Sequence, residues 1–80
     1  MPLTRDALIG HIVGELGLDQ DEFDDDTLLF SNGVLDSFSM INIIAFIEKQ
    51  AGIRVGATEV TLENLDSISR MMAYTQRKAG

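Results

Sequence analysis

The chain has 80 residues, 13 of them acidic and 6 basic, and this excess of acid argues against a nucleic-acid partner, which needs clustered Lys and Arg. A single domain over residues 1–80 leaves little chain for a substrate pocket once the core is built, which favours a binding or carrying module over an enzyme. The absence of cysteine excludes disulfides and Cys-based metal sites.

No apolar run reaches the roughly 18 residues that a membrane span needs, so we expect no transmembrane segment. Residues 1–6 lack the basic start and the following apolar run of a signal peptide. We therefore expect a cytoplasmic protein.

The first predicted helix begins after Thr4, a favourable N-cap, with Asp6 in the first turn where the helix dipole favours an anion. Apolar residues recur at helical spacing up to Leu16. Gly17 follows them and is expected to end the helix in the left-handed conformation.

A long loop is predicted from Leu18 to Asp36, and it is strongly acidic. Its first half holds Asp19, Asp21, Glu22, Asp24, Asp25 and Asp26. These acids form either a solvated segment or a negative surface that steers basic partners. An EF-hand calcium loop needs an oxygen ligand at its fifth position, and this position is Phe23 in a loop that starts at Asp19 and Leu28 in one that starts at Asp24. An EF-hand is therefore excluded, and no metal site is predicted. We expect the apolar residues of the loop to hold it against the core: Leu28, Leu29, Phe30, Val34 and Leu35.

The second predicted helix runs from Ser37 to about Ala51 and ends at Gly52. It is apolar over much of its circumference, which is typical of a central helix. At about 100° per residue, the side predicted to face the core holds Met40, Ile43, Ile47 and Ala51. The opposite side holds Phe38, Ile41, Asn42, Ala45, Glu48 and Lys49.

After an extended connector over residues 53–56, one helical turn is predicted within Thr61–Leu65. The last helix starts at Asp66 or Ser67 and directs four residues inward: Ile68, Met71, Met72 and Thr75. The sequence thus predicts an all-α protein, a small four-helix bundle with a long loop between helices 1 and 2 and a short third helix.

His11 is the only histidine, and no G-x-S-x-G elbow accompanies it. A catalytic triad is therefore not predicted, and we expect His11 to be a surface or partly packed residue.

The most informative segment is Gly33-Val34-Leu35-Asp36-Ser37-Phe38. In isolation, Asp-Ser before an apolar helix indicates a helix cap. Here a long loop delivers the pair to the central helix, and a serine at a helix N-terminus is where a phosphate diester would be stabilised. A second pair, Asp66-Ser67, has Glu63 in place of the glycine and precedes the last helix, so we interpret it as a plain helix cap.

This segment resembles the attachment motif of the acyl carrier and peptidyl carrier family, glycine-x-hydrophobic-Asp-Ser followed by Leu, Phe or Ile. The resemblance extends over essentially the whole chain and includes the flanking segments 26–30 and 52–55. Phe38 after the serine resembles stand-alone carriers, including D-alanyl carrier proteins.

The resemblance implies an acyl-carrier-type bundle with 4′-phosphopantetheine on Ser37 and with Asp36 recognised by the enzyme that attaches it. The implied partners are a phosphopantetheinyl transferase, which uses coenzyme A, and an acyl- or aminoacyl-activating ligase or synthase. The cofactor would supply the thiol for thioester chemistry, which agrees with the absence of cysteine in the chain. We expect a monomeric carrier that performs no catalysis itself.

In the family, the side of the second helix that continues from the serine is the docking surface for loading enzymes. Here that side gives Phe38, Ile41, Asn42, Ala45 and Glu48 as partner-binding candidates, with the alternative that Ile41 packs under the long loop. In carriers of fatty-acid synthesis the second helix is rich in acidic residues after the serine, whereas this helix has only Glu48. This difference favours a specialised carrier with a dedicated ligase.

The sequence does not distinguish fatty acyl, aminoacyl, D-alanyl and polyketide cargo. The competing class is an acidic helical adaptor without a prosthetic group.

Overall fold

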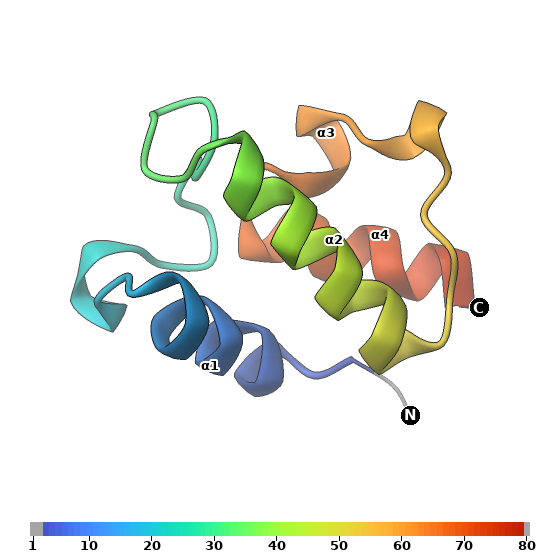
Figure 1. The fold of residues 1–80 in the computed structure, drawn as a ribbon, viewed down its shortest axis with the longest axis horizontal. Coiled ribbons are helices and arrows are strands. Elements are labelled where there is room, and N and C mark those ends of the chain that lie inside the picture. Colours follow the sequence, from blue (N-terminus) through green and yellow to red (C-terminus); the bar gives the residue numbers. More distant parts are fainter. Residues whose placement is uncertain (1–2, 80) are drawn as a thin grey trace.

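Four α-helices surround one apolar interior in the computed structural model, which describes residues 3–79 (Figure 1). Their bounds are α1 Arg5–Leu16, α2 Ser37–Ala51, α3 Leu62–Leu65 and α4 Ile68–Ala79, with 3-10 turns at Gln20–Glu22 and Ala57–Glu59. Helix α1 contacts α2 and α4, α2 lies across α4, and α3 packs on α4. The predicted four-helix bundle, its long loop and its short third helix are confirmed.

The helix ends follow local signals in the sequence. The Thr4 hydroxyl accepts the Ala7 N–H at 3.1 Å and starts α1. Gly17 and Gly52 end α1 and α2 with φ angles of 71° and 67°, in the left-handed region that glycine enters at little cost. Within residues 3–79, no helix is long and apolar enough to cross a membrane.

The core is formed by one apolar stripe from each long helix, together with Leu3, Leu65 and two residues of the loop. The predicted inward side of α2 is confirmed: Ile43 and Ile47 are buried, and Met40 and Ala51 are half-buried. Ile68, Met71 and Thr75 of α4 are also buried as predicted, whereas Met72 is half-buried. The buried apolar residues are Leu3, Leu8, Ile9, Ile12, Leu29, Leu35, Ile43, Ile47, Leu65, Ile68, Met71 and Tyr74.

Half of the acidic segment is tied down by hydrogen bonds. The Asp24 carboxylate accepts the Asp26 N–H and the Thr27 hydroxyl, both at 2.9 Å. Asp25 pairs with Arg5 at 2.6 Å, and Asp26 accepts the Ser69 hydroxyl at 3.0 Å. These hydrogen bonds shape the loop, and of the three acids Asp25 is paired with a cation. A steering surface would use the exposed acids of the segment: Asp19, Asp21, Glu22, Asp24 and Asp26. No group of three or more potential metal-binding side chains occurs in residues 3–79.

The strongest attachment of the loop is to Asp66, between α3 and α4. Its carboxylate is 1 % exposed and accepts the N–H groups of Phe30 and Ser31 at 2.8 and 3.0 Å, together with the Ser31 hydroxyl. The Asp66 carbonyl accepts the Leu29 N–H at 2.6 Å. Our interpretation of Asp66 as a plain helix cap is therefore wrong, because loop amides without a helical partner bind its carboxylate. Ser67 does cap α4, since its hydroxyl accepts the Arg70 N–H at 3.1 Å.

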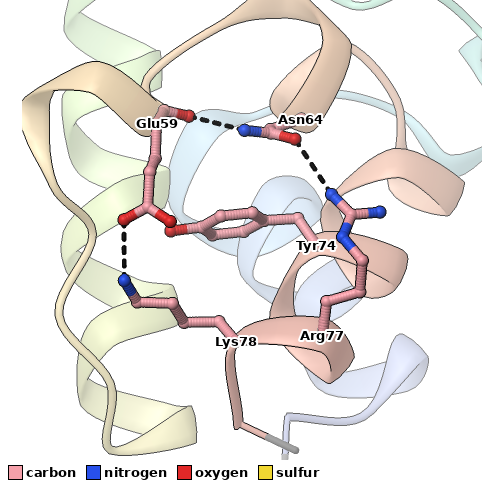
Figure 2. A pocket seen from close by; sticks show the side chains of 5 residues that line it. All are labelled: Glu59, Asn64, Tyr74, Arg77 and Lys78. Atoms are coloured by element: carbon pink, nitrogen blue, oxygen red, sulfur yellow. Dashed lines mark hydrogen bonds and ion pairs between the residues drawn. The ribbon is translucent and has the colours of Figure 1, made fainter.

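The connector after α2 is fastened to the end of α4 around a small hollow of about 230 Å³ (Figure 2). The Glu59 carboxylate accepts from Lys78 at 2.8 Å and from the Gly56 N–H at 3.0 Å. Asn64 donates to the Glu59 carbonyl at 2.9 Å and accepts from Arg77 at 3.1 Å. The Tyr74 ring projects into the middle of these polar side chains and is buried, which was not predicted from the sequence.

We predict that the stability of the protein falls in acid partly through Asp66. Burial acts to raise the pKa of Asp66, but hydrogen bonds from Ser31 and Phe30 outweigh it, so the pKa lies below its ordinary value. A lowered pKa stabilises the fold above the unfolded-state value of about 3.9, and this stabilisation is lost as the pH falls through the lower folded-state pKa. The loss is measured by comparing the free energy of unfolding in urea at neutral pH and at about pH 3. The loss should be smaller in Asp66→Asn, and an equal loss would contradict this assignment.

A second stability prediction concerns the Tyr74 hydroxyl. It is buried, and within residues 3–79 no group makes a hydrogen bond of good geometry to it, although the Glu59 carboxylate lies nearby. Burial, followed by the nearby Glu59 charge, raises the pKa of Tyr74, so the hydroxyl keeps its proton at neutral pH. Removing a buried, unsatisfied hydroxyl relieves its desolvation cost, so Tyr74→Phe should raise the free energy of unfolding by about 1 kcal/mol. A clear destabilisation on chemical denaturation would show that the hydroxyl has a partner in solution.

Candidate functional site at the start of helix α2

The segment that leads into α2 folds back on itself before the helix begins. Gly33 has a φ of 74°, the left-handed conformation that other residues rarely adopt, and its N–H donates to the Phe30 carbonyl at 3.1 Å. The Leu35 N–H donates to the Leu29 carbonyl at 2.8 Å, and the Leu35 side chain enters the core. The turn and this apolar contact fix the position from which Asp36 and Ser37 continue.

Asp36 caps α2, as its place in the motif predicted. Its carboxylate accepts the Ser39 N–H at 2.9 Å, and its carbonyl accepts the Met40 N–H at 3.0 Å. Hydrogen bonds from Ser39 lower the pKa of Asp36, so this exposed side chain is a carboxylate at neutral pH.

Ser37 is the first residue of α2, and its side chain is exposed to solvent. The N–H groups of Ser37 and Phe38 have no carbonyl partner within the helix, because each would need one four residues earlier. The positive end of the helix dipole also points here. An accessible hydroxyl beside free N–H groups fits a phosphate diester, the group through which phosphopantetheine is held.

Ser37 has no histidine beside it that would make it a nucleophile on its own. His11 lies on α1 with its ring stacked on Phe46, the ring centroids 4.0 Å apart, and its Nε2 meets the side-chain oxygen of Asn42. The expectation of a partly packed histidine is confirmed. A serine without an adjacent base is a poor nucleophile, so another protein must activate Ser37.

The outer side of α2 is largely apolar and open. Phe38 and Ile41 are 82 % and 65 % exposed, so the alternative that Ile41 packs under the loop is wrong. Asn42 and Ala45 are also exposed. Glu48 differs from our expectation, because it is half-buried and its carboxylate accepts the Val55 N–H at 2.9 Å in the connector.

A hollow of about 370 Å³ borders this outer side and was not anticipated from the sequence. It forms between α1 and α2, which meet only through tertiary packing, so no local sequence signal announces it. Its lining is His11, Asn42, Ala45, Phe46, Lys49 and Gln50.

Comparison with known proteins agrees with this geometry. Residues 6–74 match the model of the family described as phosphopantetheine attachment site. The chain is 28 % identical over 76 residues to a protein named probable acyl carrier protein PigG from Serratia sp. (strain ATCC 39006), covering 94 % of this chain and 87 % of that one. It is 34 % identical over 53 residues to a D-alanyl carrier protein from Abiotrophia defectiva, covering 66 % and 67 % of the two chains.

The family match spans most of the bundle, from the start of α1 into α4, and disfavours an adaptor without a prosthetic group. Members of this family act by holding a group for other enzymes. The chain therefore belongs to the phosphopantetheine attachment family: it is a carrier protein, not an enzyme, and it holds acyl or aminoacyl groups on a covalently attached 4′-phosphopantetheine.

Proposed function

We propose that Ser37 is the residue that carries the 4′-phosphopantetheine arm. The observation that carries this proposal is the exposed Ser37 hydroxyl at the first position of the central helix, directly after the Gly33 turn. A separate transferase would activate this hydroxyl to attack the pyrophosphate of coenzyme A. The new P–O bond forms on Ser37, the phosphate anhydride bond breaks, 3′,5′-ADP leaves with the electron pair, and the transferase takes the serine proton.

The arm supplies the thiol to which cargo is joined as a thioester, while this chain orients the attachment point and displays it to partners. Asp36 is proposed as part of the surface that the transferase recognises, because its carboxylate is exposed beside Ser37 and fixed by the Ser39 N–H. Ser67 is the obvious competitor, since it also follows an aspartate. It is buried and its hydroxyl already accepts the Arg70 N–H, which supports Ser37 as the single site.

The assignment is tested by incubating the apo protein with coenzyme A and a broad-specificity phosphopantetheinyl transferase and then measuring the intact mass. The wild type and the matched variant Ser67→Ala should each gain the mass of one phosphopantetheine group, and Ser37→Ala should gain none. Modification of Ser37→Ala, or loss of modification in a folded Ser67→Ala, would refute the proposal.

We further propose that partners dock on the outer side of α2 around Phe38 and Ile41. Both side chains are open to solvent, and Asn42 and Ala45 continue the same side. Asp36 lies at the edge of this surface and Glu48 is half-buried, and no acidic residue stands between them on α2. Docking should therefore depend on apolar burial more than on charge, with weak dependence on salt.

The partners proposed are the transferase and one dedicated ligase or synthase that activates the cargo. The names of the two relatives favour an acyl or a D-alanyl group as cargo.

We also propose a monomer, because the exposed large apolar side chains are too few for a stable dimer interface. In the described residues they are Phe38, Ile41, Val60 and Leu62. A cytoplasmic location would give the carrier access to coenzyme A.

The docking surface is tested by comparing Ile41→Ala with Ile43→Ala, two truncations of the same residue type on opposite sides of α2. Ile41→Ala should change the free energy of unfolding by no more than about 0.5 kcal/mol, as is usual at a surface position. It should lower kcat/KM for ligase loading by about tenfold, since it removes apolar area buried in the complex.

Ile43→Ala should show the opposite pattern, because Ile43 is buried in the core. A loss of about 2–5 kcal/mol of stability is expected there. Unfolding and loading measured on the same samples separate the two effects. Normal loading of Ile41→Ala by the ligase would exclude this surface as the docking site.

A further inference from the structure

The segment that leads to Ser37 is held by one buried side chain that is distant in sequence. Asp66 lies at the junction of α3 and α4, and its carboxylate binds the N–H groups of Phe30 and Ser31 and the Ser31 hydroxyl. Its own carbonyl accepts the Leu29 N–H. Residues 29–31 are thus fixed to a single residue 35 to 37 positions away in sequence.

The residues held by Asp66 in turn hold the rest of the segment. The Phe30 carbonyl accepts the Gly33 N–H at 3.1 Å, and the Leu29 carbonyl accepts the Leu35 N–H at 2.8 Å. Asp36 and Ser37 follow immediately. A continuous chain of hydrogen bonds therefore runs from Asp66 through residues 29–31 to the turn directly before the attachment serine.

We propose that Asp66 is a positioning residue for the modification of Ser37, an inference that rests on the assignment of Ser37 above. Asp66 does not contact Ser37 in this network, and it acts by ordering residues 29–36 against the start of α4. The backbone of Ser37 is also held by α2, whose Ile43 and Ile47 lie in the core. The contribution of Asp66 is therefore to the shape of the surface that a transferase recognises before the chemical step.

This mechanism predicts which kinetic constant changes. If residues 29–36 lose their fixed shape, the transferase must order them when it binds, and the cost appears at binding. KM for the carrier should rise, whereas kcat should change little, because the bound serine reaches the same arrangement.

The atoms used by Asp66 provide a conservative variant. Both backbone N–H groups bind Oδ1, and the Ser31 hydroxyl binds Oδ2. An asparagine keeps an oxygen that accepts the two N–H groups and offers an NH₂ group to the Ser31 oxygen. Asp66→Asn therefore retains the hydrogen bonds without the charge, whereas Asp66→Ala removes these hydrogen bonds. Ser67→Ala is the matched control, since it removes the neighbouring cap of α4 and none of the loop bonds.

The experiment measures transferase kinetics and amide hydrogen exchange for the full-length apo protein, at a temperature where all variants are folded. Asp66→Ala should raise KM about tenfold and leave kcat within about twofold, while Asp66→Asn and Ser67→Ala stay near the wild type. Exchange at Phe30, Ser31, Gly33 and Leu35 should accelerate in Asp66→Ala, and the protection of Ile43 and Ile47 in α2 should remain.

A wild-type KM in Asp66→Ala, with its loop amides exposed, would overturn the proposal. If Asp66→Ala also loses protection in α2, the milder Ser31→Ala decides, because it removes only the bond to Oδ2. A raised KM with α2 protected supports the positioning role, and an unchanged KM overturns it. Failure of the Ser37 assignment is distinguishable, since it appears as modification of Ser37→Ala or as no modification of the wild type, whatever Asp66 does.

Discussion

The Asp66 carboxylate binds loop amides that no other element of the bundle satisfies, and the course of the long loop depends on it. A loop of this length in a small domain contributes little to the core, since Leu29 and Leu35 are its only buried residues. Its backbone N–H groups still need partners. Asp66 supplies them for residues 29–31, and Ser69 binds the Asp25 carbonyl and the Asp26 carboxylate a few residues earlier. Both halves of the loop are thus fastened to the start of α4.

The two sides of α2 have different environments. Its inner side, with Ile43 and Ile47, forms the centre of the core and keeps the helix in place. Its outer side leaves Phe38 and Ile41 open to solvent, where they form the surface proposed above for docking.

The acidic residues of the chain are less free than their number suggests. Asp24, Asp25 and Asp26 shape the loop, Asp36 caps α2, and Asp66 is buried. Glu48 and Glu59 bind backbone amides of the connector. Between the exposed Asp36 and the half-buried Glu48, helix α2 has no acidic residue, so its outer side is more apolar than the net charge of −7 implies and differs from carriers with an acidic second helix.

The sequence by itself determined the features that depend on neighbours within about four residues along the chain. The Thr4 and Asp36 caps, the glycines that end α1 and α2, and the inner side of α2 were all predicted from spacing and residue type. The tertiary structure decided the features whose partners are distant. Asp36 and Asp66 each precede a serine, yet Asp36 is an exposed helix cap and Asp66 is a buried acceptor for the distant N–H groups of Phe30 and Ser31. Glu48 is half-buried rather than open on the outer side, and the burial of Tyr74 was not predicted, because burial and long-range hydrogen bonds arise only when separate segments are brought together.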